Sequence, residues 1–255
     1  MEFSFLKVHV AGRVGWLEYN RPPVNAFHWE MVDELIPAFD QLHGDPDVRV
    51  IVLASAVPGY FSSGADLNVF ATITSARMYE WVTRCHAFVR RLRQSDKPLL
   101  AAIQGTAVGG GLEMTLHCDL RFAGSGARLG QPEIAIGMIP PVGATQALAR
   151  LLGRPAAVRF LWEGKLLDAN EARTLGLVDE VVPDDELRER VSAYAADLAG
   201  KPAPALAAIR RTITEGGGVS FEEGLEIERD WAARLAGTTE FRDGVHAFLE
   251  NRKRR

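Results

Sequence analysis

The sequence contains few cysteines and has no long apolar run. Cys85 and Cys118 are the two cysteines in 255 residues, so no disulfide framework is expected and a reducing, cytoplasmic setting is predicted. No apolar stretch approaches the roughly 20 residues that span a bilayer. Residues 1–14 lack a basic region followed by an apolar one, so no signal peptide is expected. These absences argue against a disulfide-stapled secreted domain and against a membrane partner.

An excess of basic charge is also missing. The chain carries 29 Lys and Arg against 33 Asp and Glu, which gives a formal net charge of −4. This balance argues against a nucleic-acid partner bound through a broad basic face. Apolar residues make up 47% of the chain, enough to form the core of a globular protein.

Several familiar catalytic motifs are absent. The sequence has no G-x-x-x-x-G-K-[ST] loop, no G-x-G-x-x-G after its first strand, no H-E-x-x-H and no G-x-S-x-G. Its six histidines are scattered, and His117 and Cys118 lie on a predicted apolar helix. A nucleotide cofactor, a metal site and a serine or cysteine hydrolase are therefore not expected. Carboxylates and backbone groups remain as the candidates for chemistry.

Strands and helices alternate over the first part of the chain, which predicts an α/β fold. A glycine-containing turn at 11–13 joins two β-prone runs into a predicted hairpin, and the continuous apolar run 48–54 predicts a strand covered on both faces. The predicted strands are 5–10, 14–19, 48–54, 99–104 and 119–123, the predicted helices are 28–43, 75–94 and 110–118, and residues 55–70 and 105–111 are predicted to be a loop and a glycine-rich turn.

The pattern changes near residue 195. Beyond it the periodicity is helical only, with helices predicted at 206–213, 221–235 and 245–250 and a glycine loop at 216–218. We therefore predict two parts, a core over 1–195 and a helical region over 196–255. A strandless tail packs poorly on itself, so it is expected to cover the core or a neighbouring subunit.

Two glycine-containing loops follow buried strands and lead towards helices, Phe61–Leu67 (FSSGADL) and Ala107–Glu113 (AVGGGLE). Backbone N–H groups from two such loops can converge on one oxygen as an oxyanion hole, although ordinary glycine turns are an alternative explanation. Glu113 begins the second predicted helix, and Glu133 returns towards it if the intervening strand runs antiparallel to that helix. Paired, partly buried carboxylates suit acid–base chemistry, whereas a glutamate in a first helical turn is often simply solvated.

Together the motifs resemble those of the crotonase (enoyl-CoA hydratase/isomerase) superfamily over nearly the whole chain. The matching segments are Asn20–Asn25 (NRPPVN), Phe61–Leu67, Ala107–Glu113, Cys118-Asp119, Gly130–Glu133 (GQPE), Gly164–Val178 and Ala247–Arg252 (AFLENR). The resemblance implies a spiral of repeated ββα units, with a C-terminal helical region that builds homotrimers or dimers of trimers.

The resemblance also implies the activity and the roles of site residues. The backbone N–H groups of Ala65 and Gly110 would hold the thioester oxygen of an acyl-CoA substrate. Glu113 and Glu133 would hold a water between them, with Glu133 supplying the proton to Cα, so that an enoyl-CoA is hydrated without a metal or an organic cofactor. The residues expected to bind the CoA moiety are Ser63, Ala65, Asp66, Leu67, Asn68 and Gly110.

The sequence departs from the family pattern at Pro141, Ala147, Asn68 and Asn251. Pro141 replaces a glycine and has no N–H, and the other three stand where basic residues are common in the family. A double-bond isomerase and a non-catalytic acyl-CoA-binding protein therefore stay as alternatives. A further hypothesis is an acyl pocket formed by Phe70, Met78, Trp81 and Val82. The alternative is that these side chains belong to the core. The basic tail Arg252–Arg255 is a candidate for attracting the CoA phosphates.

Overall fold

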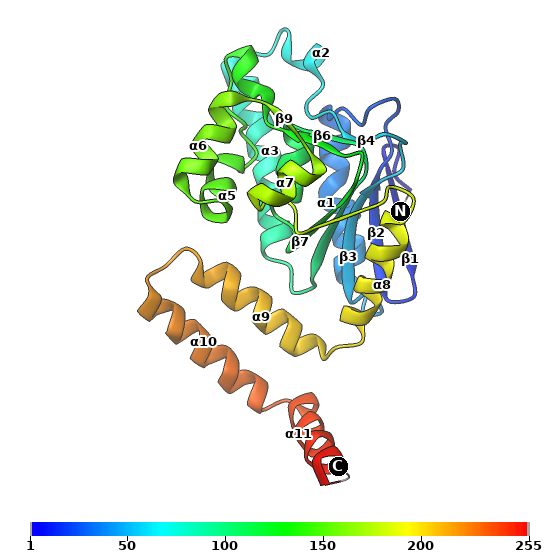
Figure 1. Cartoon of the computed structure of the whole chain (residues 1–255), viewed down its shortest axis with the longest axis vertical. Coiled ribbons are helices and arrows are strands. Elements are labelled where there is room, and N and C mark those ends of the chain that lie inside the picture. The colour runs from blue at the N-terminus through cyan, green and yellow to red at the C-terminus, as the bar shows by residue number, and fades with distance from the viewer. Residues whose placement is uncertain (1, 254–255) are drawn as a thin grey trace.

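The computed structural model describes residues 2–253 and contains two sheets with helices packed around them (Figure 1). The larger sheet has the strand order β1-β2-β3-β5-β7-β10. β1 and β2 form the predicted antiparallel hairpin, and every later neighbour in this sheet is parallel. Its strands are β1 (Leu6–Ala11), β2 (Val14–Tyr19), β3 (Val50–Ser55), β5 (Leu99–Ile103), β7 (Leu120–Gly124) and β10 (Glu180–Val182).

The smaller sheet runs in the order β4-β6-β8-β9. β4, β6 and β8 are parallel, and β9 is antiparallel to β8. Three successive strand pairs, β3/β4, β5/β6 and β7/β8, each place their first strand in the larger sheet and their second in the smaller one. The mixed α/β architecture predicted from the sequence is thereby confirmed. The strands are β4 (Tyr60–Ser62), β6 (Thr106–Val108), β8 (Arg128–Gly130) and β9 (Leu166–Asp168).

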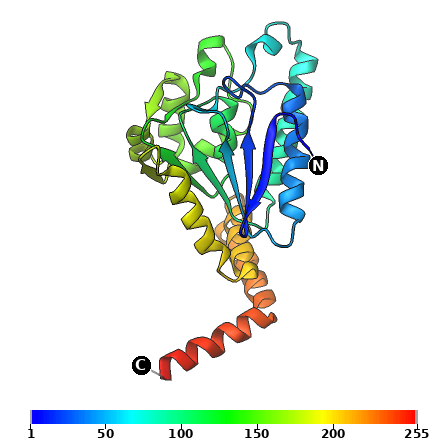
Figure 2. The ribbon, with the colours of Figure 1, turned by 90° about the vertical axis from the view of Figure 1, so that its right-hand side faces the viewer.

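The larger sheet is covered by helices on both faces (Figure 2). Side chains alternate along β3, so that Ile51 and Leu53 join one apolar cluster while Val50 and Val52 join the other. The first cluster lies under the helices α1 (Trp29–Gly44) and α3 (Ser75–Arg93), and the second under α8 (Leu187–Ala199). The prediction that this strand is buried on both faces is correct.

Three short elements occupy segments that the sequence predicted as irregular. β4 and the helix α2 (Leu67–Phe70) lie within 55–70, and β6 lies within 105–111. A strand of three residues is too short to carry an alternating pattern, so its existence depends on partners distant in sequence. The helix predicted over 110–118 is also shorter, because α4 (Gly110–Thr115) is followed by tight turns in which the N–H groups of 116–118 bond three residues back.

The helices between β8 and β10 lie beside the smaller sheet (Figure 1). Residues 138–143 form an irregular turn between a 3-10 helix and the α-helix that follows it. The helices are η1 (Pro132–Ile136, a 3-10 helix), α5 (Ala144–Leu151), α6 (Arg154–Glu163) and α7 (Ala169–Leu175).

The C-terminal region is helical, as predicted, and projects from the core (Figures 1 and 2). It consists of α9 (Ala203–Gly216), α10 (Phe221–Ala236) and α11 (Thr239–Lys253). Large apolar side chains stay uncovered there, with Ile213 71%, Phe221 79% and Phe248 70% exposed. Residue 195 lies within α8, and the division of the chain into two parts stays a prediction. Of the proposed basic tail, Arg254 and Arg255 lie outside the described residues.

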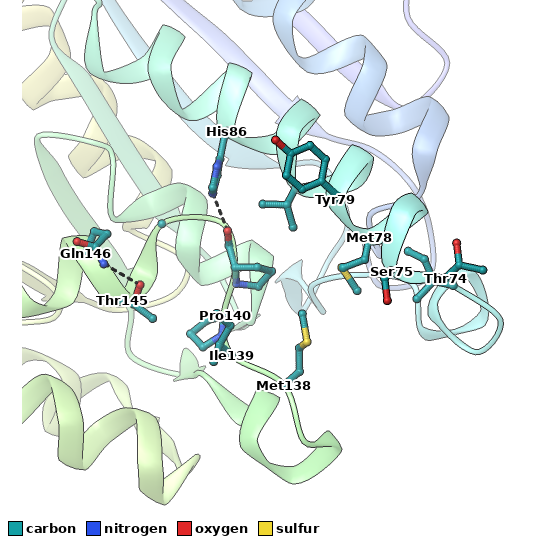
Figure 3. Close-up of a pocket in the computed structure, with 14 residues that line it drawn as sticks. Thr74, Ser75, Met78, Tyr79, His86, Met138, Ile139, Pro140, Thr145 and Gln146 are labelled. Carbon is teal, nitrogen blue, oxygen red and sulfur yellow. Dashed lines mark hydrogen bonds between the residues drawn. The ribbon is translucent and has the colours of Figure 1, made fainter.

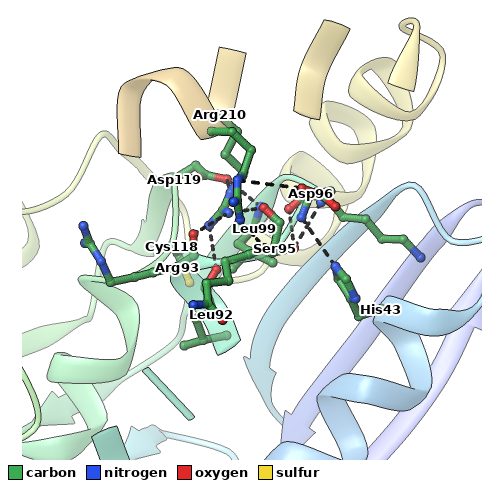
Figure 4. Close-up of polar contacts among 12 residues, drawn as sticks. His43, Leu92, Arg93, Ser95, Asp96, Leu99, Cys118, Asp119 and Arg210 are labelled. Carbon is green, nitrogen blue, oxygen red and sulfur yellow. Dashed lines mark hydrogen bonds and ion pairs between the residues drawn. The ribbon is translucent and has the colours of Figure 1, made fainter. Parts of the chain in front are cut away.

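Arg210 attaches α9 to the core (Figure 4). Its guanidinium is buried, donates to Asp119 Oδ2 at 2.8 Å and to the Leu92 carbonyl at 2.8 Å, and also bonds the carbonyls of Arg93 and Ser95. The Leu92 and Arg93 carbonyls belong to the C-terminal end of α3, where helical carbonyls lack partners within the helix, and Ser95 follows that end. A cation at this end is favourable, and the docking fixes where the tail leaves the core.

Candidate active site

The predicted site residues gather around one cavity at the edge of the smaller sheet. Because β4, β6 and β8 are parallel neighbours, the segments that follow their carboxyl ends lie side by side. These segments begin at Ser63, Gly109 and Gln131. The cavity has a volume of about 230 Å³. Its lining includes Ser63, Ala65, Leu67, Gly110, Glu113 and Glu133.

Two backbone N–H groups at this cavity have no acceptor. Within residues 2–253, neither the N–H of Ala65 nor that of Gly110 donates a hydrogen bond to another protein group. The two loops touch each other, since a Cβ placed on Gly64 would lie 3.3 Å from the Gly110 nitrogen. Polar backbone groups in a protein interior normally have partners, so two unpaired donors on adjoining loops are suited to bind an oxygen atom of a ligand.

The loop that carries Ala65 is shaped by the segment 20–25. Asn25, fully buried and with φ of 51°, donates to the Phe61 carbonyl at 3.0 Å, and Ser62 Oγ donates to the Asn25 carbonyl at 2.7 Å. The same hydroxyl accepts from the Gly64 N–H at 3.0 Å. The sequence motif at 20–25 therefore acts by supporting the loop rather than by lining the cavity.

Glycine is required where the second loop passes the first. A Cβ on Gly111 would lie 2.6 Å from Ser62 Cβ, and one on Gly109 would lie 2.8 Å from Glu133 Oε1. Gly109 also has φ of 52°, in the region that favours glycine. The triple glycine is thus explained by close approach, and the contact of Gly109 with Glu133 confirms that Glu133 returns to the start of α4.

Glu113 is completely buried on α4 and is held by the turn 138–143 and the residue after it. One carboxylate oxygen, Oε1, accepts from the Val142 N–H at 2.7 Å and from the Ala144 N–H at 3.1 Å. The other, Oε2, has no hydrogen-bond partner among residues 2–253. Burial raises the pKa of Glu113 to about 8, with the charge of Glu133 adding to the rise and the two N–H groups opposing it.

Glu133 is partly buried at the start of η1 and lies beside Gly109. Burial raises the pKa of this carboxyl group as well, against the effect of its own backbone N–H. The side-chain amide of the buried Gln131 lies against this carboxyl group, and when the carboxyl group is ionised the amide nitrogen can donate to it, 3.1 Å from Oε1 and 3.0 Å from Oε2. Two carboxyl groups with raised pKa values thus share one cavity.

Not all residues predicted to bind CoA line the cavity. Asp66 forms an ion pair with Arg21 at 3.0 Å and caps α2 by accepting from the Asn68 N–H at 3.1 Å. Although partial burial acts in the opposite direction, the hydrogen bonds from Asn68 and Arg21 lower the pKa of Asp66. Asp66 and Asn68 therefore stabilise the loop, and a contact of either with CoA stays a prediction.

A second, larger cavity adjoins the first (Figure 3). It has a volume of about 680 Å³ and lies between residues 73–86 and residues 138–146, and the two cavities share Met138 and Pro141. The proposed acyl-pocket residues divide between the two. Phe70 and Trp81 line the cavity with the glutamates, and Met78 and Val82 line the larger one.

Several residues of the site were not predicted individually. Gln131 lies within a recognised motif, so the motif itself was a signal, although its contact with Glu133 required the fold. Val142 and Ala144 act through backbone N–H groups, which no side-chain pattern reveals. Among the described residues, no three His, Cys, Asp or Glu side chains form an arrangement that could hold a metal ion.

Comparison with known proteins agrees with this geometry. Residues 11–255 match the family described as Enoyl-CoA hydratase/isomerase. The chain belongs to this family. Its relatives include a probable mitochondrial enoyl-CoA hydratase 2 of Arabidopsis thaliana, 36% identical over 90% of this chain and 76% of the relative. The crotonyl-CoA hydratase of Syntrophomonas wolfei is 32% identical over 93% of this chain and 92% of its own length.

A solved structure shares the family fold throughout. The crystal structure of an enoyl-CoA hydratase from Geobacillus kaustophilus superimposes with a TM-score of 0.95 at 31% identity, covering 98% of this chain and 96% of that one. The fold predicted from the crotonase resemblance is therefore confirmed, including the C-terminal helices. Within residues 2–253, every helix is too short or too polar to cross a membrane.

Proposed function

We infer that this member of the enoyl-CoA hydratase/isomerase family adds water to a trans-2-enoyl-CoA and gives the 3-hydroxyacyl-CoA in a reversible reaction. The observation that carries this inference is the presence of two carboxyl groups, Glu113 and Glu133, on one cavity that also exposes two unpaired backbone N–H groups. Curated relatives named as hydratases support the same activity.

The N–H groups of Ala65 and Gly110 hold the thioester oxygen. Attack of water at Cβ moves electron density through Cα and the carbonyl group, so the negative charge of the resulting enolate develops on that oxygen. Each well-placed donor of this kind stabilises such a transition state by about 3–4 kcal/mol. Both donors belong to loops fixed by buried contacts, so they need little rearrangement when the charge develops.

Glu113 and Glu133 divide the proton transfers between them. Glu113 in its ionised form accepts a proton from the attacking water through Oε2, the oxygen that no described residue bonds. Glu133 in its protonated form donates to Cα, and burial favours that form by raising its pKa. Positioned acid–base groups contribute a rate factor of roughly 10² to 10⁴. The proposed steps use no metal and no organic cofactor.

The substrate enters along the loop 63–68. Ser63, Ala65 and Leu67 line the cavity mouth, and the Leu67 side chain is 60% exposed, so we place the CoA moiety against this loop. The acyl chain extends past Met138 and Pro141 towards the larger cavity. Pro141 supplies no N–H to the catalytic water, so in this proposal the two carboxyl groups hold that water.

The test is a panel of trans-2-enoyl-CoA substrates of increasing chain length. Loss of the enoyl absorbance and a mass increase of one water are expected for at least one of them. The double variant Glu113→Gln/Glu133→Gln should abolish turnover while still binding the CoA thioester in a titration, and Glu189→Gln, at an exposed position on α8, serves as the matched control. Binding without turnover across the panel would instead favour a non-catalytic acyl-CoA-binding protein.

The same assay separates hydration from double-bond isomerisation. An isomerase converts a 3-enoyl-CoA into its conjugated 2-enoyl isomer and needs one carboxyl group to carry the proton. Conjugation of a 3-enoyl-CoA with no addition of water to any 2-enoyl-CoA would replace the proposed activity. The pair of carboxyl groups on one cavity favours hydration.

We also propose that α9–α11 form a subunit interface in a homotrimer or a dimer of trimers. The exposed apolar side chains of these helices support this, together with a cavity of about 340 Å³ lined by Leu235, Phe241, Val245 and Phe248 among others. Light scattering after size-exclusion chromatography should give a trimer or hexamer mass, and Phe248→Glu should lower it. A monomeric wild-type protein would contradict the proposal.

A cytoplasmic location is proposed on the two cysteines. Cys85 and Cys118 are free and buried, so neither takes part in a disulfide. The Arabidopsis relative is named as mitochondrial, so fractionation with a tagged chain is the appropriate measurement, and recovery with an organelle fraction would contradict the proposal.

A further inference from the structure

The turn at residues 138–143 and the start of α5 hold Glu113 by a single oxygen. Both donors, the N–H groups of Val142 and Ala144, bind Oε1, and in the part of the chain that the structure describes no group bonds Oε2. The direction in which Oε2 points therefore depends on where this stretch of backbone lies. A small rotation of the Pro141–Val142 peptide group would displace the Val142 N–H, which makes the shorter of the two hydrogen bonds to Oε1.

That peptide group is held from its other side by a histidine. His86 on α3 places Nε2 at 2.7 Å from the Pro141 carbonyl oxygen (Figure 3). A carbonyl oxygen only accepts hydrogen bonds, so Nε2 carries the proton and donates it. The Pro141 carbonyl and the Val142 N–H belong to one peptide group. A continuous chain of hydrogen bonds therefore runs from the imidazole through this peptide group to Glu113 Oε1.

Such a chain is stronger than its separate bonds. Donation to the carbonyl oxygen polarises the peptide group, which makes its N–H a better donor, and the effect is larger in a buried environment. The imidazole also prevents the peptide plane from rotating. Both effects act on Glu113, although His86 itself lines the larger cavity and not the one that contains the glutamates.

His117 makes the equivalent bond to the next carbonyl group. Its Nε2 lies 3.1 Å from the Val142 oxygen, and it is buried against Gly143, where a Cβ would come within 2.9 Å of the ring. Burial lowers the pKa of His117 to about 4, against the bond to Val142, so this ring stays neutral. Substitution of His117 would disturb the core. His86 is only half-buried, so it can be changed with less disturbance.

We propose that His86 is a positioning residue for the hydratase reaction, acting on Glu113 through the Pro141–Val142 peptide group. The proposal rests on the proposed function, because it assigns Glu113 the role of base. It also explains how a turn that contains Pro140 and Pro141 presents its next N–H group accurately. The proline at 141 removes its own N–H from the turn but leaves its carbonyl oxygen free to accept from His86.

The charged groups near Glu113 differ from those near His86. Glu113 has Glu133 on η1 and the thiol of Cys85 on α3 near it. A further cavity is lined by His86, His117 and three arginines, Arg90, Arg93 and Arg150, and no carboxyl group of residues 2–253 lines it. A bond from Val142 favours the ionised form of Glu113, so weakening that bond raises the pKa of Glu113.

The test compares His86→Leu with His86→Gln in the full-length protein. Leucine cannot donate, whereas the glutamine amide can reach a carbonyl and donate. We expect His86→Leu to lower kcat about tenfold, with KM changed less than about twofold, and His86→Gln to recover most of the loss. Arg90→Gln, an exposed position one turn further along α3, is the control for a change of side chain on this helix.

The pH profile distinguishes positioning from a general loss of structure. Activity requires ionised Glu113, so it rises with pH through the pKa of this group. In His86→Leu this rise should move to higher pH by roughly one unit, measured from about pH 6 to about pH 10. A fall in kcat with an unmoved profile and no recovery in His86→Gln would overturn the proposal, as would unchanged kinetics in His86→Leu.

A measurement without turnover separates this proposal from the proposed function. Carbon-13 NMR of labelled glutamate side chains, with the Glu113 signal assigned by its absence in Glu113→Gln, follows the titration of Glu113 directly. The midpoint should lie higher in His86→Leu than in the wild type. If no 2-enoyl-CoA is hydrated but the midpoint moves, the proposed function fails and the coupling stands. If hydration occurs and the midpoint does not move, the coupling fails alone.

Discussion

The two glutamates of the cavity are held in different ways. Glu113 lies on a helix, is completely buried, and is bound by two backbone N–H groups through one oxygen. Glu133 lies at the start of a five-residue 3-10 helix, is only partly buried, and contacts the side-chain amide of Gln131. One side of the cavity is therefore rigid and built from backbone, and the other is more open and depends on a side chain.

This difference suits the two proposed roles. A base that orients a water benefits from a fixed direction, which backbone donors on a packed turn provide. An acid must stay protonated until the enolate forms and then recover a proton, and partial exposure allows that recovery from solvent. The comparison predicts that a change on the Glu113 side costs more activity than the equivalent change on the Glu133 side.

Glu113→Gln should have the largest effect on turnover. The amide keeps the size of the side chain and cannot accept a proton from water, so kcat is expected to fall by about 10³. Steady-state hydration of the best 2-enoyl-CoA measures this. A loss smaller than that of Glu133→Gln would reverse the proposed order of the two sides.

Glu133→Gln is expected to lower kcat by about 10², because solvent on the open side can replace part of the proton delivery. In deuterated water, incorporation of deuterium at Cα should lose stereochemical purity, since the proton no longer comes from one fixed group. NMR of the product shows this. Product of unchanged purity would indicate that Glu133 is not the acid.

Gly109→Ala probes the contact between the two sides. The new Cβ would lie 2.8 Å from Glu133 Oε1 and would require φ of 52° at an alanine, so kcat is expected to fall about tenfold as Glu133 is displaced. Gly12→Ala is the matched control, since φ is 62° there and no atom lies within 4 Å of the added Cβ. Equal losses of activity in both variants would show that the backbone penalty alone is responsible.

Gln131→Met should have a smaller effect on turnover. Methionine fills a similar volume and cannot donate to Glu133, so the ionised form loses a partner and the pKa of Glu133 rises further. We expect a kcat reduction of about threefold to about tenfold and a shift of the alkaline side of the pH profile to higher pH. An unmoved alkaline side would separate Gln131 from the titration of Glu133.

The smallest effect concerns stability. Because the pKa of Glu113 is raised from 4.5 to about 8 in the folded protein, the folded state holds a proton that the unfolded chain releases between these values. This group therefore lowers stability progressively as pH rises through that window. Relative to the wild type, the melting temperature of Glu113→Gln should increase across the same pH range, and a constant difference between the two would contradict the burial of a titrating carboxyl group.

Much of the fold was predictable because its signals are local or periodic. The hairpin of β1 and β2, the doubly buried strand β3, and the helices α1 and α3 follow from apolar spacing and turn residues that lie within a few positions of one another. β4 and β6 could not be predicted in this way, since three residues contain no period. Their pairing with each other across more than forty residues stabilises them, and local sequence does not encode it.

The functional site likewise combines features that local sequence shows with contacts that only the fold creates. Glycines beside an acidic residue, as in Ala107–Glu113, indicate a loop whose backbone must approach something closely, and this much is local chemistry that a sequence shows. The meeting of Glu113 with Glu133, the binding of Glu113 by Val142, and the bond from His86 to Pro141 involve residues between 20 and 55 positions apart. These contacts arise only when parallel strands bring their carboxyl ends to one edge and α3 packs beside them. Residue types thus determine which chemistry is available, whereas packing determines which groups meet, because distances across a folded core are independent of separation along the chain.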